Sequence, residues 1–272
     1  MSQPCFSRSW PPELGPAAHL IIVHGYAEHS GRYERLARDL NDAGLHVHAW
    51  DLRGHGQSPG RRGQIKDFAA LVADLSRFVE RTREKVGNSP VFILGHSMGG
   101  LLTAHYLAGE SAGIRGAIFS SPLMAIPDHV SPLLLGMSRI LGMVAPGLPV
   151  DRLDSKGIAT APEVVEAYDT DPLVYHGPIC ARTGAALAHA IQILPALLPR
   201  ITVPLLVFHG TADPIAPPSG SQLLMDHAGS TDKSCFSVDG GFHELLNDTG
   251  REKVIQKMLA WIERHGAASG AL

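Results

Sequence analysis

Strongly apolar runs alternate with amphipathic stretches through residues 1–122. The runs "HLIIVHG" (19–25) and "PVFILGH" (90–96) are almost continuously hydrophobic, which is typical of parallel strands covered on both faces. The amphipathic stretches place apolar residues three or four positions apart, as in a helix with one buried face. The alternation returns after residue 200. This pattern predicts an α/β fold with a doubly wound, mostly parallel sheet.

The pattern also sets the expected order of elements. Helices are expected to end at Gly44, to begin after a capping Asp67, and to run from Met98 to about Ala108; two more are expected near 217–228 and over 251–266. The expected parallel strands are 19–25, 45–51, 90–96, 114–122, 203–210 and 233–240.

The alternation stops between residues 123 and 200. This segment is rich in Leu, Met, Gly and Pro and indicates helices and turns. A chain of 272 residues fits one large α/β domain with an insertion. We therefore expect a catalytic core of residues 1–122 and 201–272, and a helical cap of residues 123–200 inserted between two sheet strands.

Composition narrows the class of protein. The net charge of −3 argues against a general nucleic-acid surface. Cys5, Cys180 and Cys235 are odd in number and far apart, which does not fit a disulfide framework. The N-terminus has no secretory pattern, and no run of 18 apolar residues could cross a bilayer. A cytoplasmic protein, peripheral at membranes at most, is expected; the oligomeric state stays open.

Fifteen histidines raise the question of a metal. "HVH" (46–48) would put two imidazoles on one face of a strand, but the sequence contains no H-E-x-x-H motif. Since no set of ligands has a recognisable spacing, we expect no catalytic metal and no other cofactor.

The stretch "LGHSMGG" (94–100) carries the pattern G-x-S-x-G between a predicted strand and a predicted helix. That strand–turn–helix context suits a nucleophile, because a sharp turn projects the serine Oγ above the sheet. Gly95 and Gly99 are expected to be small to avoid clashes in the turn. The helix beginning at Met98 points its positive end at the site. Ser97 is the candidate nucleophile.

A serine needs a base, and the base needs an orienting acid, in the chain order Ser, Asp or Glu, His. Asp213 follows the strand "VPLLVFHG", and His243 follows the strand "KSCFSVDG". Both therefore lie on loops at the same sheet edge as Ser97. Acyl transfer also needs oxyanion donors. We expect these to be the backbone N–H groups of Met98 and Tyr26.

The motifs "HGYAEHSGRY", "DLRGHGQS", "LGHSMGG", "HGTADPI" and "GGFHELLND" resemble the monoacylglycerol lipase family of α/β-hydrolases and its lysophospholipase-like relatives. The resemblance implies hydrolysis of monoacylglycerol to glycerol and fatty acid through an acyl-enzyme. It implies the same triad and oxyanion donors. It also implies that Glu28, Arg32 and Tyr168 lie near the glycerol end of the substrate; the alternative is a structural ion pair between Glu28 and Arg32, with Tyr168 packed in the cap.

Two positions and the N-terminal segment depart from the family pattern. Ala27 stands where the family usually has Gly, and Leu246 stands where some members have a glycerol-facing histidine. The short N-terminus leaves room for one antiparallel strand, "CFSRSW" (5–10). The second departure keeps other activities open: a lysophospholipase, a short- or medium-chain carboxylesterase or, less favoured, a thioesterase. A non-catalytic binding protein is disfavoured because no triad member is missing.

The cap offers two interpretations. Its apolar residues could form a lid that shields an acyl tunnel and makes reversible contact with a membrane or lipid surface, or they could close a small core of their own. We favour the lid, because Ser138 and Arg139 are too few to make a polar helix face. The apolar residues concerned are Leu133 to Leu135, Met137, Ile140, Leu141, Met143 and Val144.

Overall fold

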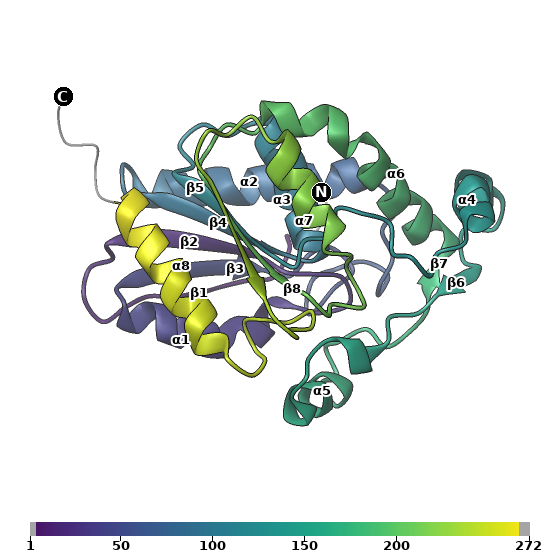
Figure 1. The fold of residues 1–272 in the computed structure, drawn as a ribbon, viewed down its shortest axis with the longest axis horizontal. Helices are drawn as coiled ribbons and strands as arrows, with labels where there is room; N and C mark the ends of the chain where they lie inside the picture. Colours follow the sequence, from purple (N-terminus) through teal and green to yellow (C-terminus); the bar gives the residue numbers. More distant parts are fainter. Residues whose placement is uncertain (1–3, 267–272) are drawn as a thin grey trace.

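A seven-stranded sheet organises the computed structural model, which describes residues 4–266 (Figure 1). The strand order is β1-β3-β2-β4-β5-β8-β9, and every neighbouring pair is parallel except β1 with β3. The doubly wound, mostly parallel sheet is thus confirmed. The strands are β1 (Ser7–Trp10), β2 (Ala18–Val23), β3 (Leu45–Trp50), β4 (Val91–His96), β5 (Gly116–Ser120), β8 (Leu205–Gly210) and β9 (Lys233–Val238).

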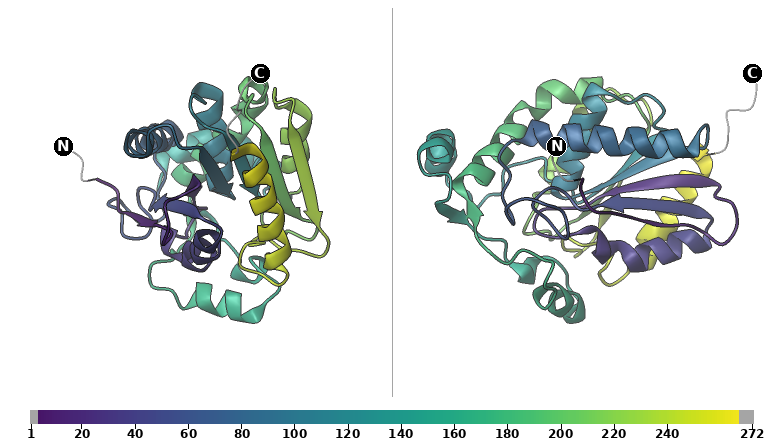
Figure 2. Two further views of the ribbon diagram at one scale, coloured as in Figure 1. Left: turned by 90° about the vertical axis from the view of Figure 1, so that its left-hand side faces the viewer. Right: turned by 180° about the vertical axis from the view of Figure 1, so that it is seen from behind.

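Helices cover both faces of this sheet, as Figure 2 shows for α2 and α1 on opposite sides. One face packs against α2 (Phe68–Val86), α3 (Met98–Gly109) and α7 (Ser219–His227). The other packs against α1 (Glu34–Asp42) and α8 (Arg251–Gly266). Every residue of β2, β4, β5 and β8 is buried. Burial on both faces explains why these strands are continuously apolar.

The helix α2 begins and ends as its sequence indicates. The Asp67 carboxylate accepts a hydrogen bond from the backbone N–H of Ala69 at 2.9 Å, which caps the first turn. Gly87 ends the helix at φ 63°, a left-handed conformation that glycine adopts without strain. The predicted cap at Asp67 is confirmed.

The chain between β5 and β8 adds no strand to the main sheet. It forms α4 (Pro132–Val144), β6 (Pro149–Asp151), α5 (Pro162–Asp169), β7 (Ile179–Cys180) and α6 (Ala181–Leu197), and β6 pairs only with β7. Figure 1 shows α4, β6 and β7 beyond the right-hand end of the sheet and α5 apart from them, at the lower right. The helix α6 buries Leu187, Ile191 and Leu194 in the same core as α3. Within residues 4–266, no helix is both long and apolar enough to cross a membrane.

Candidate active site

Ser97 occupies a strained turn between β4 and α3. Its φ of 53° places a non-glycine residue in the left-handed region, which costs roughly 1–2 kcal/mol. Surrounding backbone bonds hold it there: Ser97 N–H donates to the Ser120 carbonyl at 3.0 Å, and the Ser97 carbonyl accepts from Gly100 N–H at 2.9 Å and Leu123 N–H at 3.0 Å. Such strain is sustained where the surroundings fix the backbone, which is common at active sites.

The glycines flanking Ser97 have no room for a side chain. A Cβ on Gly99 would lie 2.0 Å from the Val23 carbonyl oxygen. A Cβ on Gly95 would lie 2.6 Å from Thr103 Oγ1 and 2.7 Å from Gly100 Cα. The elbow therefore requires both glycines, because backbone atoms from β2 and α3 close around the turn.

Asp213 and His243 meet at the carboxyl ends of β8 and β9. The His243 Nδ1 lies 2.8 Å from Asp213 Oδ2, and both side chains are buried. The other carboxylate oxygen of Asp213 accepts N–H bonds from Ile215 at 2.8 Å and Ala216 at 3.0 Å. The carboxylate is thus fixed by its own loop and can orient the imidazole.

Electrostatics favour an ionised acid beside a basic imidazole. Burial tends to raise the pKa of Asp213, but attraction to His243 and hydrogen bonds from His209, His243 and Ala216 N–H hold that pKa well below its usual range. For His243, burial acts to lower the pKa, but the Asp213 charge and hydrogen bond outweigh it and raise the pKa above 6.5. The pair can accept and return a proton near neutral pH.

Two further histidines support this pair, and the sequence did not single them out. His96 packs on His243 with ring centroids 4.7 Å apart, and its Nδ1 lies 3.0 Å from the Ser120 carbonyl oxygen. Burial holds the pKa of His96 well below 6.5, so it is neutral. His209 Nε2 lies 3.3 Å from Asp213 Oδ2. His96 is the last residue of β4 and His209 lies within β8, and their places in predicted strands were the only sequence signal for these two residues.

The loop after β2 runs alongside Ser97. A Cβ on Gly25 would lie 3.1 Å from Ser97 Cβ and 3.0 Å from Glu28 Oε1. The Tyr26 hydroxyl donates to the Gly63 carbonyl at 2.8 Å, so this hydroxyl already has a hydrogen-bond partner within the protein. Ala27, where the family usually has glycine, adopts φ 70°. The backbone here is one that glycine would adopt with less strain.

The N–H groups of Tyr26 and Met98 are the candidate oxyanion donors. Within residues 4–266, neither has a hydrogen-bond partner. Met98 is the first residue of α3, where backbone N–H groups have no intrahelical acceptor. Both groups can therefore donate to an oxygen that develops charge beside Ser97.

Glu28, Arg32 and Tyr168 form one buried cluster with Glu244. The Arg32 Nη2 donates to Glu244 Oε2 at 2.6 Å, and Arg32 Nε lies 3.6 Å from Glu28 Oε2. The Arg32 guanidinium lies 4.7 Å from the Tyr168 ring centroid. Glu28 Oε1 accepts from Gly25 N–H at 2.5 Å and from the Tyr33 hydroxyl at 2.8 Å. Glu244, adjacent to His243 in the sequence, is a member that the sequence analysis missed.

Two polar atoms of this cluster have no hydrogen-bond partner. The Tyr168 hydroxyl and Arg32 Nε are buried without a hydrogen bond. A buried polar group without a partner costs free energy of the order of 1–3 kcal/mol. These atoms are therefore suited to binding polar groups of a substrate. Leu246, three residues after His243, stands where some family members have a glycerol-facing histidine. In this protein it is buried in the core that α1 and α8 cover.

An apolar cavity of about 130 Å³ lies beneath the cap segment. It begins at Leu123, whose N–H binds the Ser97 carbonyl, and extends between α4 and α6. Its wall is almost entirely apolar: Leu123, Ile126, Pro127, Val130, Leu135, Leu141, Val150, Ile179, Ala181, Gly184, Ala185, Leu187, Ala188 and Ile191, with Ser138 and Asp151. A cavity of this kind fits a hydrocarbon chain.

The described residues contain one group of three side chains that could hold a metal. It consists of His19, the second residue of β2, and His46 and His48, the second and fourth residues of β3, whereas the triad follows the carboxyl ends of the strands. The sequence places two of these histidines on one strand face. His19 joins them only through the pairing of β2 with β3, which no local pattern in the sequence reveals.

Comparison with known proteins shows the family of the chain. The family model described as "Serine aminopeptidase, S33" matches residues 15–250. The chain is 38% identical to a monoacylglycerol lipase of Mycolicibacterium smegmatis, covering 94% of this chain and 91% of that one. It is 34% identical to the monoglyceride lipase of Homo sapiens, covering 97% and 88%. The crystal structure of a Paleococcus ferrophilus monoacylglycerol lipase superposes with a TM-score of 0.86 at 31% identity, covering 97% of this chain and all of that one. The chain belongs to the monoacylglycerol lipase-like family of α/β-hydrolases.

Proposed function

We propose that the protein hydrolyses monoacylglycerol to glycerol and a fatty acid through an acyl-enzyme on Ser97. The observation that carries this is the position of Ser97 between two unlike surroundings. Leu123, whose N–H donates a hydrogen bond to the Ser97 carbonyl, lines an apolar cavity. On the other hand, Gly25 lies between Ser97 and Glu28 of the buried polar cluster of Glu28, Arg32, Tyr168 and Glu244. A substrate with one long apolar end and one small polar end fits both.

The triad residues have distinct roles in this reaction. His243 accepts the proton of Ser97 Oγ as the oxygen attacks the ester carbonyl, and then gives it to the leaving glycerol oxygen. Water, activated by His243, releases the fatty acid in the second half-reaction. Asp213 keeps the proton on Nδ1 of His243, which leaves Nε2 free to act as base. The N–H groups of Tyr26 and Met98 stabilise the oxyanion in both halves.

The polar cluster recognises the glycerol end in this proposal. Glycerol hydroxyls can donate to the Glu28 carboxylate and accept from the unpartnered Arg32 Nε and Tyr168 hydroxyl. The ion pairs within the cluster also hold these side chains in place. Structural and binding roles are thus combined in the same residues.

The segment 123–200 acts as the cap over this site in our proposal, and α4 is its lipid-facing element. Leu133, Met137, Ile140 and Val144 follow one another at helical spacing and are 72%, 43%, 57% and 73% exposed. Leu135 and Leu141 of the same helix face the apolar cavity. An outer apolar stripe with an inner apolar wall suits reversible contact with a lipid surface, from which the substrate enters.

The test compares kcat/KM for five substrates: medium- and long-chain monoacylglycerol, a diacylglycerol, lysophosphatidylcholine and p-nitrophenyl esters. We expect monoacylglycerol to be preferred, and Ser97→Ala to remove all hydrolysis. Fast turnover of short p-nitrophenyl esters with little on any glyceride would reduce the function to a general carboxylesterase. A preference for lysophosphatidylcholine would identify a lysophospholipase.

Tyr168→Phe tests the glycerol contact separately. Because the buried Tyr168 hydroxyl has no hydrogen-bond partner in the fold, its removal should not lower stability and should raise it by up to about 3 kcal/mol. The KM for monoacylglycerol should rise about tenfold, the value of one lost hydrogen bond. The kinetics with p-nitrophenyl esters, which lack glycerol, should stay as in the wild type. An equal change for both substrates would refute the contact.

A further inference from the structure

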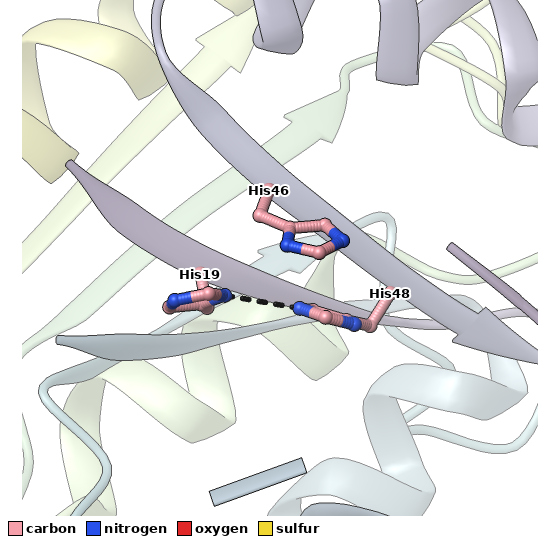
Figure 3. A group of neighbouring side chains, drawn as sticks. All are labelled: His19, His46 and His48. Atoms are coloured by element: carbon pink, nitrogen blue, oxygen red, sulfur yellow. Dashed lines mark hydrogen bonds between the residues drawn. The ribbon is translucent and has the colours of Figure 1, made fainter. Parts of the chain in front are cut away.

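Three histidines from the neighbouring strands β2 and β3 meet toward the amino-terminal ends of these strands, whereas the active site follows the carboxyl ends (Figure 3). His19 on β2 is the register partner of His46 on β3, and His48 lies two residues further along the same strand face. One imidazole nitrogen from each lies within 4.8 Å of those of the other two. The triad follows the carboxyl ends of the strands, so roughly 20 Å of strand separates the two places.

The spacing of the imidazole nitrogens suits a shared metal ion. His19 Nδ1 and His48 Nε2 are 3.0 Å apart. Two nitrogens bound to one tetrahedral zinc ion at about 2.05 Å would be about 3.3 Å apart. The His46 ring stacks on His48 with centroids 4.1 Å apart, and its buried Nε2 has no hydrogen-bond partner. Two ligands are almost in place, and the third residue has an unused nitrogen.

The charge state of the three rings also suits metal binding. Burial, with repulsion from neighbouring histidines, lowers the pKa of His19 to about 4 and that of His48 to about 3. Burial lowers the pKa of His46 too. All three imidazoles are therefore neutral at pH 7 and offer lone pairs. Lys85 of α2 adds positive charge near His48, but it is exposed and solvent screens it.

We propose that His19, His46 and His48 bind one divalent transition-metal ion of the zinc class. Imidazole ligands favour such ions over Mg²⁺ or Ca²⁺, which prefer oxygen. His46 and His48 are half-buried, so solvent can reach the cluster and supply a fourth ligand. The bound ion links β2 to β3 and stabilises the fold. It has no part in ester hydrolysis, because the site lies a strand length from Ser97.

The experiment titrates untagged protein with Zn²⁺ in competition with a chromogenic chelator at pH 7.5. We expect one ion per chain in the wild type. Loss of an outer-shell partner typically weakens metal binding about 10–100-fold, so loss of a ligand in His46→Gln or His48→Gln should weaken it at least tenfold. His227→Gln, an exposed histidine at the end of α7, is the matched control and should bind as the wild type does.

Thermal unfolding with and without Zn²⁺ gives a second readout. The ion should raise the Tm of the wild type and of His227→Gln but not that of His46→Gln. The His46 Nε2 has no hydrogen-bond partner, so His46→Gln breaks no hydrogen bond of that atom. This variant therefore still tests the proposal if His48→Gln does not fold. Equal zinc affinity in the wild type and both cluster variants would overturn the proposal. So would loss of binding only in His243→Gln, which would assign the ion to the catalytic histidine.

Discussion

The imidazole of His243 donates from Nδ1 to Oδ2 of Asp213 over 2.8 Å, with both side chains buried. Asp213 is itself held by two N–H groups of its own loop and by His209. The acid therefore fixes both the orientation and the tautomer of the base. This relationship leads to the first prediction.

Asp213→Asn should lower kcat by about 10³–10⁴-fold, because an amide at this position favours the wrong tautomer of His243. In the wild type, kcat/KM should rise with pH as His243 loses its proton, with a midpoint above 6.5, since Asp213 raises the pKa of His243. In the variant, burial of His243 is unopposed, so the midpoint should move to lower pH. A pH–rate profile of both proteins measures the shift; coincident midpoints would contradict the assigned pair.

Gly99→Ala should destabilise the fold by more than about 3 kcal/mol, the range of severe strain or overpacking. Its Cβ would meet the Val23 carbonyl oxygen at 2.0 Å, and backbone cannot move aside as a side chain can. Gly109→Ala in the same helix is the control. There a Cβ meets nothing within 4 Å, and alanine should stabilise by up to about 1 kcal/mol. Chemical denaturation of both variants measures the difference in stability. Similar unfolding midpoints for Gly99→Ala and Gly109→Ala would contradict the prediction.

The sequence was sufficient for the arrangement of the fold because each signal for it is local. Continuous apolar runs mark strands buried on both faces, and Asp67 and Gly87 mark the ends of α2. The predicted strand 114–122 was longer than β5, Gly116–Ser120. Arg115 N–H still donates to the Val91 carbonyl and Ser121 N–H to the Phe208 carbonyl, but the regular ladder does not continue beyond these bonds. Periodicity shows which residues are buried, but hydrogen bonding sets where a strand ends.

The candidate site was less accessible from the sequence, because much of it depends on contacts between distant segments. Ser97 lies in a recognisable strand–turn–helix pattern. Glu244 meets Arg32 from 212 residues away, and His96 reaches His243 only after β4 and β9 enter one sheet. No periodicity or spacing predicts such pairs. The unpartnered Tyr168 hydroxyl is likewise a property of the packed structure.

Glu28 should make stability depend on pH around neutrality. Burial and the charge of Glu244 raise the pKa of Glu28 to about 7, although Arg32 acts in the opposite direction. A carboxyl whose pKa is raised on folding stabilises the fold below its unfolded pKa, near 4.5, and that contribution is lost as pH rises through 7. The wild type should therefore lose stability between about pH 4.5 and pH 7, at up to about 1.4 kcal/mol per pH unit, with little further loss above pH 7.

Denaturant midpoints at four pH values across this range measure the effect. Glu28→Gln cannot ionise and should show a smaller loss with pH than the wild type. Glu84→Gln, an exposed residue of α2, is the control and should keep the wild-type slope. Identical slopes in wild type and Glu28→Gln would place the titration in another group.

The last prediction concerns the apolar stripe of α4. Replacing Ile140 and Val144 together with serine should leave stability within roughly 0.5 kcal/mol per residue, because both are exposed. Each loses up to about 1.5 kcal/mol of burial in lipid, so vesicle binding should weaken at least about tenfold. Hydrolysis of a short, soluble ester should not change, since these side chains do not line the cavity. Leu14→Ser, 84% exposed in the loop between β1 and β2, is the control and should bind vesicles normally. If the double variant lost activity equally on vesicles and on the soluble ester, α4 would be acting on the site itself and not on the lipid surface.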